Sequence, residues 1–501
     1  RGPLTLAALD AAGARHELAS VTAARRAQWM SLAIDVRGLA GASVVLLLEI
    51  GPGTQAALRA PYLEGRRSAP PPPPTGKRRP AASPDVVLIL LDAARGDRFT
   101  GAYRRATTPR IGAELADALL FRRAYAECPT TSCSVPAIVT GTSFLAGGEV
   151  FTGRRLPDEL TTLAEALAAA SYHTAGLSAS PNNAAQRNST QGFAQFRELW
   201  GRGNPGWGPQ TQARLAAEAI AAAPADRPLY LQLHLLPPHQ PYEPPPAFDR
   251  FTDPAYRGPV TPRMSLAPYN LGLATLPPAD LTQLVGLYDG NLLVADDVVA
   301  QVLAALRESG RFDDSVIVLT SDHGEAFMEH GRQGHNTTLY DEMLHVPLLL
   351  RLPGGERPAA VDTDRVASSL DIVPTVLGVL GLPVPAGLDG IDLLGAAPDP
   401  RRPRLLFHRT SAPKGAAYAV RAGRFKAISR PSHARQELYD LERDPGEAEN
   451  LVLERPDLFA GLGLLLAQHI AASDQAPTGD AVELTAEARE ALEALGYVDG
   501  E

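Results

Sequence analysis

The chain has 501 residues, of which 45% are hydrophobic and 21% are charged, so global disorder is excluded. The formal net charge of −9, from 47 basic and 56 acidic side chains, argues against a general nucleic-acid binder, which needs a basic face. The 2 cysteines, Cys128 and Cys133, are too few for a disulfide scaffold or a cysteine-based zinc module. No apolar run reaches the roughly 18–20 residues of a membrane span.

The first 67 residues have the pattern of a β-rich segment. Residues 29–36 and 44–50 are short, apolar and bounded by glycines, as strands are. They are similar to the last strands of a β-sandwich domain, and a truncated β segment is the alternative. The chain starts at Arg1 rather than at methionine, so we expect a fragment whose upstream part could carry a signal peptide or an anchor. Residues 68–84 contain five consecutive prolines and predict an extended linker.

From residue 85 to about 400 the sequence alternates apolar strands with helical stretches. Continuous apolar runs, typical of strands buried on both faces, lie at residues 86–91, 229–234 and 315–320. Helices are expected at residues 160–170, 210–223 and 280–309. This alternation predicts an α/β fold with a mostly parallel central sheet flanked by helices.

Polar side chains follow the three apolar runs. Asp92 ends the first run, His234 or His239 follows the second, and Asp322 with His323 follows the third. Because ligands bind at the carboxyl ends of the strands in open α/β sheets, these residues form a candidate metal site. Carboxylate and imidazole ligands suit zinc, manganese, magnesium or calcium. The alternative for each aspartate is capping of the helix that follows its strand.

Residues 401–501 predict a smaller α+β subdomain. Antiparallel strands are expected at residues 404–408, 416–421 and 425–428, and helices at 456–472 and 485–495.

Seven segments between residues 85 and about 450 resemble the sulfatase branch of the alkaline phosphatase superfamily, in the family's order. They are residues 90–97, 131–141, 238–242, 320–325, 345–348, 371–375 and 437–451. The resemblance implies an alkaline phosphatase-like catalytic domain and an extracytoplasmic, periplasmic or secreted, protein. It also places Asp92, Asp322 and His323 on one divalent metal ion, with the nucleophile as the fourth ligand and with room for a second metal.

The nucleophile segment departs from the sulfatase pattern. Sulfatases carry Cys-x-Pro-x-Arg, whose cysteine becomes formylglycine, nine residues before a Thr-Gly pair. Counting back nine residues from Thr140 gives Thr131, whereas Cys133 lies two residues too late and Val135 replaces the arginine. Residues 131–136 resemble instead the Thr-x-x-Ser-Val-Pro motif of lipid A phosphoethanolamine transferases. We therefore expect Thr131 to be the nucleophile and a metal ligand; Thr130 is a neighbouring candidate that the spacing disfavours.

The resemblance assigns second-site roles to further residues. His239 and His335 contact the substrate's anionic group or a second metal, with a hydrogen-bonded surface histidine as the alternative for each. His234 and His330 are weaker candidates. Arg95 either orients its loop or neutralises the substrate's anion.

Two other features bear on the site. Ala93 replaces the family's partner carboxylate, which argues against a calcium cage of three aspartates. Cys128 and Cys133 flank Thr131, and we expect buried small hydrophobic side chains rather than a pair, with pairing open for an exported protein.

The sequence therefore predicts a metal-dependent hydrolase of sulfate or phosphate and phosphonate esters, acting on small-molecule, glycan or lipid anionic substrates. A sulfo-threonine lacks the second hydroxyl that releases sulfate from formylglycine, so phosphorus esters are favoured. The alternatives are a phospho-alcohol transferase and a non-catalytic protein that kept the fold. The oligomeric state is not predicted.

Overall fold

The structure is a computed structural model, and it describes residues 3–10, 15–22, 44–50, 83–143, 154–200, 208–395, 403–410, 415–431, 434–473, 479–482 and 484–495. Its largest element is a seven-stranded sheet in the order β5-β14-β10-β4-β9-β7-β8. The strands, in that order, are Leu119–Leu120, Leu348–Arg351, Ser315–Ser321, Asp85–Asp92, Leu229–Pro238, His173–Ser178 and Gln195–Glu198.

The three predicted apolar runs form the centre of this sheet. β4 pairs in parallel with β10 on one side and with β9 on the other. Every residue of β4 and β10 is buried, which explains why these strands are apolar throughout. Only β14 runs antiparallel to its neighbours within this sheet. The predicted mostly parallel α/β fold is confirmed.

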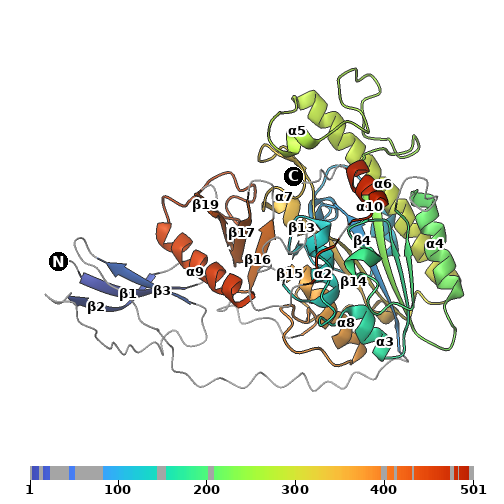
Figure 1. Cartoon of the computed structure of the whole chain (residues 1–501), viewed down its shortest axis with the longest axis horizontal. Helices are drawn as coiled ribbons and strands as arrows, with labels where there is room; N and C mark the ends of the chain where they lie inside the picture. Colours follow the sequence, from blue (N-terminus) through green and yellow to red (C-terminus); the bar gives the residue numbers. More distant parts are fainter. Residues whose placement is uncertain are drawn as a thin grey trace.

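Alternate side chains of β4 enter two different cores. Val87, Ile89 and Leu91 pack with residues of α4 (Pro209–Ala222) and α6 (Pro278–Glu308). Val86, Leu88 and Leu90 pack with residues of α2 (Thr131–Thr140), α3 (Leu163–Ala169) and α8 (Ile372–Leu380). Helices therefore cover both faces of the sheet (Figure 1). The predicted helices at 160–170, 210–223 and 280–309 correspond to α3, α4 and α6.

Shorter elements connect the sheet to the site and to the rest of the chain. They are α1 (Pro109–Glu114), β6 (Arg123–Tyr125), α5 (Ala267–Asn270), β11 (Ala326–Phe327), β12 (Gln333–Gly334), α7 (Asp341–Leu344), β13 (His345–Val346) and β15 (Val366–Ser368). β11 and β12 form a hairpin, and β13, β6 and β15 form a small sheet.

The C-terminal part contains a four-stranded antiparallel sheet with a helix packed on it. Its strands are β16 (Leu405–Thr410), β17 (Ala417–Ala422), β18 (Phe425–Arg430) and β19 (Arg435–Asp440), and the helix is α9 (Pro456–Ser473). The last helix, α10 (Ala486–Ala494), lies away from α9 and packs against Ala184 and Trp200 of the larger body (Figure 1). The domain boundary at residue 400 stays a prediction.

The N-terminal segment forms a three-stranded antiparallel sheet in the order β2-β1-β3. Its strands are Arg15–Thr22, Pro3–Asp10 and Val44–Ile50. The expected strand at residues 44–50 is present. The expected strand at 29–36 and nearly all of the predicted linker at 68–84 lie outside the described residues.

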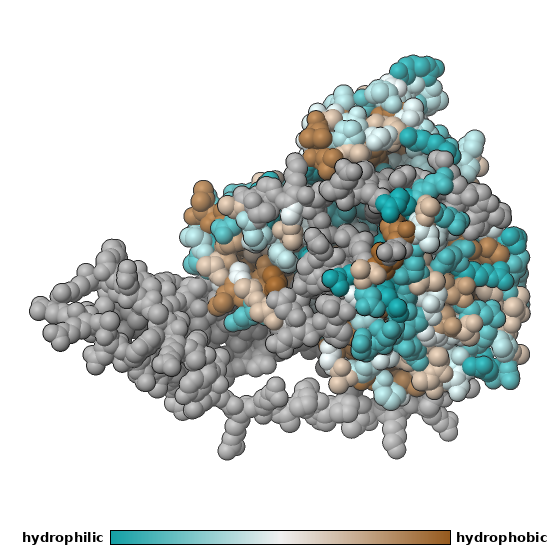
Figure 2. Space-filling model, viewed as in Figure 1, coloured by the Kyte–Doolittle hydropathy of each residue, from teal (hydrophilic) through white to brown (hydrophobic). Residues whose placement is uncertain are grey.

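Hydrophilic side chains cover much of the described surface on the face that Figure 2 shows, and apolar side chains gather on it near α5 and on α9. Leu273, just after α5, is 72% exposed. Within the part of the chain that the structure describes, no helix combines the length and the apolar character that crossing a bilayer requires.

Candidate active site

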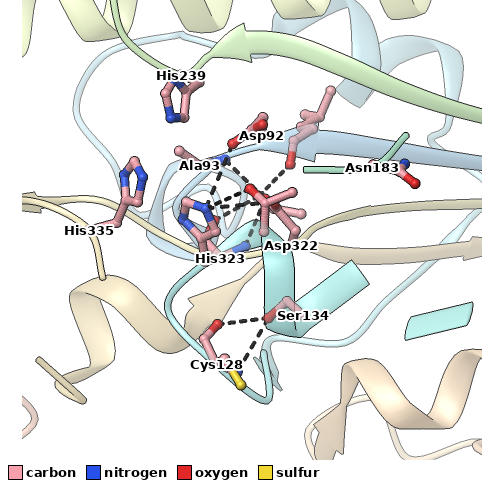
Figure 3. Close-up of polar contacts among 12 residues, drawn as sticks. Asp92, Ala93, Cys128, Ser134, Asn183, His239, Asp322, His323 and His335 are labelled. Carbon is pink, nitrogen blue, oxygen red and sulfur yellow. Dashed lines mark hydrogen bonds and ion pairs between the residues drawn. The ribbon is translucent and has the colours of Figure 1, made fainter. Parts of the chain in front are cut away.

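Three of the predicted metal ligands meet at the carboxyl edge of the central sheet. Asp92 ends β4, and Asp322 and His323 follow β10, whose Ser321 pairs with Leu91. One ligand atom from each of the three side chains lies within 4.8 Å of the others, and all three residues are buried (Figure 3). The parallel pairing of β4 and β10 thus brings together residues 230 positions apart in the sequence.

The hydrogen bonds around this group leave its ligand atoms free for a cation. The backbone N–H groups of Ala93 and His323 donate to Oδ1 of Asp322, at 3.2 and 2.9 Å. Oδ2 of Asp322 and Oδ1 of Asp92 are buried and have no hydrogen-bond partner among the described residues. Two buried carboxylates this close together require a positive charge between them, so these residues fit a divalent metal ion.

The ring of His323 is oriented for ligation. Its Nδ1 donates to the carbonyl oxygen of Gly324 at 2.9 Å, which leaves the lone pair on Nε2. Nε2 lies 3.7 Å from Oδ1 of Asp92 and 3.6 Å from Oδ2 of Asp322. Burial opposes ionisation of Asp92, but interactions with the neighbouring His239, His234 and His323 outweigh it and lower the pKa of this carboxyl below its ordinary value.

Thr131 lies beside the same group. It is the first residue of α2 and is fully buried, and its Oγ1 lies 3.4 Å from Nε2 of His323. A helix N-terminus presents backbone N–H groups and a positive dipole end, which favour an anionic oxygen at this position. The candidate nucleophile and the candidate ligands are thus adjacent.

The expectation of two unpaired cysteines was wrong. Cys128 and Cys133 form a disulfide with a Cα–Cα distance of 5.9 Å, because the turn before α2 brings them together around Thr131. Ser134 strengthens this turn, since its hydroxyl donates to the Cys128 carbonyl at 2.7 Å and accepts from the Cys128 N–H at 3.3 Å (Figure 3). The segment that carries Thr131 is therefore closed by a covalent bond and two hydrogen bonds.

His234 lies close to Asp92, Asp322 and His323, which we call the metal group, although the sequence made it a weaker candidate. It lies within β9, and its Nε2 is 3.3 Å from Oδ2 of Asp92 and 3.8 Å from Oδ2 of Asp322. The Asn183 amide lies 3.1 Å from Nδ1 and holds the ring. Burial alone would lower the pKa of His234. The hydrogen bond to Asp92 and the charges of both aspartates outweigh burial, so the pKa of His234 is raised. The parallel pairing of His234 with Leu90, two residues before Asp92, brings its ring to the aspartates.

His239 and His335 lie beside the group, and their predicted contact with the substrate's anion or a second metal stays a prediction. The ring centroid of His335 lies 4.3 Å from that of His323 and 4.9 Å from that of His239 (Figure 3). Nδ1 of His335 lies 3.0 Å from Oε1 of the buried Glu325, whose role the sequence did not specify. Burial raises the pKa of Glu325, but His335, His239 and His323 together lower it, so Glu325 is a carboxylate that orients His335.

The two other candidates, Arg95 and His330, contact loop residues rather than the metal group. The Arg95 guanidinium forms ion pairs with Asp97 and Glu329 and donates to the Glu325 carbonyl at 2.9 Å, which favours the orienting role over anion binding. The contacts of His330 are with residues outside the metal group. It pairs with Glu342 at 2.8 Å and donates to a backbone carbonyl of the C-terminal part at 3.1 Å.

Comparisons with known proteins find similar sequences and similar structures. The sulfatase family profile matches residues 84–382, and the profile of the C-terminal region of N-sulphoglucosamine sulphohydrolase matches residues 329–458. Arylsulfatase K of Bos taurus is 31% identical over 180 residues, 33% of this chain and 33% of the relative. The multifunctional alkaline phosphatase superfamily protein PehA of Trinickia caryophylli is 36% identical over 124 residues, 24% of this chain and 23% of the relative. The matched segments thus span a third or less of these relatives.

Solved structures share the fold. A 2-O GAG sulfatase has a TM-score of 0.64 at 19% identity and covers 81% of this chain and 99% of its own. The phosphonate monoester hydrolase of Agrobacterium radiobacter has a TM-score of 0.62 at 22% identity and covers 78% of this chain and 96% of its own.

Proposed function

We propose that this chain, which belongs to the sulfatase family, is a metal-dependent hydrolase of sulfate or phosphate and phosphonate esters with Thr131 as its nucleophile. One observation carries the proposal. The ligand atoms of Asp92, Asp322 and His323 lie within 4.8 Å of one another in a buried site, and the Thr131 hydroxyl lies 3.4 Å from His323.

The proposed metal ligands are Asp92, Asp322, His323 and the Thr131 hydroxyl. A divalent ion bound by them would lower the pKa of that hydroxyl and neutralise charge on the ester oxygens. One imidazole among carboxylates suits zinc or manganese better than calcium or magnesium. Ala93 supplies a backbone N–H to Asp322 where the family's pattern has a third carboxylate, which also disfavours calcium.

The surrounding side chains fit roles in an in-line displacement. The Thr131 hydroxyl releases its proton to water, and its Oγ1 forms a bond to phosphorus or sulfur as the bond to the leaving oxygen breaks. The leaving oxygen takes a proton from His335, whose ring Glu325 holds at 3.0 Å, and His239 binds a non-bridging oxygen. Water then attacks the phospho- or sulfo-threonine and regenerates the hydroxyl. A threonine ester has no neighbouring hydroxyl to expel sulfate, which favours phosphorus esters.

The test is a panel of 4-nitrophenyl sulfate, 4-nitrophenyl phosphate, a phosphate diester and a phenylphosphonate ester, with several divalent metals. Thr131→Ala should lower kcat by about a thousandfold or more, because it removes the nucleophile. Thr131→Ser, which keeps a hydroxyl, and Thr130→Ala, one residue away, are the matched controls. Full turnover in Thr131→Ala would remove Thr131 from the mechanism.

The same assay separates hydrolysis from group transfer and from the formylglycine route. A transferase would place the phosphoryl group on an added alcohol and release little to water. Mass spectrometry of the quenched enzyme should find the adduct on Thr131. A formylglycine at position 133 would instead indicate the ordinary sulfatase mechanism, in which that cysteine is oxidised.

We also infer an extracytoplasmic location and a small-molecule or glycan ester substrate. The disulfide between Cys128 and Cys133 supports the location, because disulfides persist in oxidising compartments. A glycosaminoglycan sulfatase among the structures of similar fold supports the substrate class.

A further inference from the structure

A turn that carries an arginine lies beside the candidate active site. Arg332 is the last residue of the turn between β11 and β12, three residues before His335. Its guanidinium lies against the backbone of Gly272, where an added Cβ would come within 1.8 Å of Nη1. Asn270, two residues earlier, donates to the His335 carbonyl at 3.0 Å. Three extended residues span at most about 11 Å, so the backbone of Arg332 lies within about 11 Å of that of His335, whose ring centroid is 4.3 Å from that of His323.

Two more arginines approach this turn from the C-terminal sheet. Arg430 ends β18 and pairs across the sheet with Arg435, the first residue of β19. Nη2 of Arg435 lies 3.5 Å from the Tyr340 hydroxyl. The Tyr340 ring stacks on His330, with centroids 3.5 Å apart, and His330 is two residues from Arg332.

These three arginines, which we call the arginine cluster, carry more positive charge than the protein neutralises. Arg435 pairs with the buried Glu437. By contrast, Nη1 of Arg332 and Nε of Arg430 are buried and find no hydrogen-bond partner in the described part of the chain. Burial and then the charges of Arg430 and Arg435 lower the pKa of the Arg332 guanidinium, so the three groups repel one another. A bound anion would relieve this repulsion.

We propose that the arginine cluster is an anion subsite that binds a second sulfate or phosphate group of the substrate, distant from the ester that is cleaved. Planar guanidinium groups suit tetrahedral oxyanions, since each offers several donors in fixed directions. The substrate would then carry at least two anionic groups, one at the metal group and one at Arg332 and Arg430. This inference rests on the proposed function. It concerns which substrates bind, and not how the ester is cleaved.

The test compares substrates with one and two anionic groups. KM and kcat are measured for glucosamine monosulfate and disulfate, and for glucose monophosphate and bisphosphate, which distinguish sulfate from phosphate. The double variant Arg332→Gln/Arg430→Gln should raise KM about tenfold or more for the doubly charged member of a pair. The kcat values and KM for the singly charged member should stay within about twofold. Salt should raise KM for the doubly charged substrate in the wild type and less in the variant.

Two controls separate a subsite from a general effect. Arg214→Gln removes an exposed positive charge on α4 that pairs with Glu218 on the same helix, and it should leave all KM values unchanged. Arg332→Lys/Arg430→Lys should recover part of the selectivity. Equal melting temperatures of wild type and variants establish that the fold is intact.

Failure of the inference differs from failure of the proposed function. If the wild type cleaves 4-nitrophenyl esters but treats singly and doubly charged sugars alike, the subsite is refuted and the proposed function stands. If no ester is cleaved, the proposed function fails, and calorimetry of glucosamine disulfate binding still decides the subsite. Binding that the double variant weakens about tenfold supports it, and binding that is absent or unchanged overturns it.

Discussion

Lys426→Met is expected to destabilise the protein strongly, because Lys426 is the buried cation that joins α7 to the C-terminal sheet. Its side chain is 0% exposed, and its Nζ lies 2.8 Å from Oδ1 of Asp341 and 2.8 Å from Oε1 of Glu447. Asp341 keeps a second cation, since Arg421 lies 3.1 Å from it. Glu447 has a 1% exposed side chain and would be left as a buried carboxylate without a cation.

The expected loss in the free energy of unfolding is about 3–5 kcal/mol, the usual cost of removing one partner of a buried ion pair. For a folded body of about 400 residues, an unfolding entropy of about 2.1 cal/mol/K per residue converts 4 kcal/mol into a fall of about 5 °C in Tm. The exposed Arg443→Met, which loses only a 3.9 Å surface pair with Asp440, is the matched control and should change Tm by less than about 1 °C.

The pH dependence of this loss has a definite sign. Burial raises the pKa of Glu447 to about 7, although Lys426 opposes the rise. Removing Lys426 raises that pKa further, so folded Glu447 binds a proton near neutral pH that the unfolded chain does not bind. A protonated Glu447 needs no cation, and the stability gained from that proton is lost as the pH rises. The fall in Tm should therefore be larger at pH 8 than at pH 6.

A thermal melt at the two pH values and a rescue variant test this reasoning. Glu447→Gln in the Lys426→Met background should recover at least half of the lost stability, because a neutral amide replaces the unpaired carboxylate. A fall in Tm below 1 °C, or a fall that is equal at pH 6 and pH 8 and is not rescued, would refute the assignment of Glu447 as the destabilised group.

Three further predictions concern the site. Chelation with EDTA should abolish ester hydrolysis and lower Tm, and added zinc or manganese should restore both; full activity in protein shown to be metal-free would contradict a metal-dependent mechanism. His234→Ala should raise the metal concentration for half-maximal activity at least tenfold, because this imidazole faces both aspartates; an unchanged metal titration would count against that role. Replacing Cys128 and Cys133 together by serine should cost about 2 kcal/mol, the entropy of closing a six-residue loop, and should lower kcat; a silent double variant would mean that the disulfide does not position Thr131.

The sequence predicted the sheet and the metal group because both depend on local patterns. A strand buried on both faces must be apolar throughout, so three such runs identified β4, β9 and β10, and parallel pairing then placed Asp92 and Asp322 together. His234 was ranked low because its position depends on how β9 pairs with β4. That pairing sets His234 opposite Leu90, and no local pattern reveals which strands pair.

The cysteine pair was missed for a related reason. Cysteines five positions apart pair only if the intervening turn brings their Cα atoms within about 7 Å, and the spacing alone does not fix that turn. Here the first turn of α2 and the hydrogen bonds of Ser134 close it. Tertiary geometry, rather than composition, decided between two buried thiols and a disulfide.

The hairpin at residues 325–335 connects the chemistry of the site to its proposed selectivity. It carries Glu325 and His335 at one end and Arg332 at its turn, and Arg95 anchors it through Glu329 and the Glu325 carbonyl. His330 ties the same hairpin to the C-terminal part, since its two nitrogens meet a carboxylate and a carbonyl.

That carbonyl belongs to Glu447, the residue that Lys426 holds through its side chain. The buried charges between α7 and the C-terminal sheet form a junction, and Arg332 and Arg430 lie on opposite sides of it. We therefore expect this junction to set where Arg332 lies relative to Arg430. It follows that Lys426→Met should weaken the preference for doubly charged substrates at temperatures below its Tm, and should leave turnover of 4-nitrophenyl esters less affected. Equal losses for both kinds of substrate would mean that the junction supports the fold and does not shape the anion subsite.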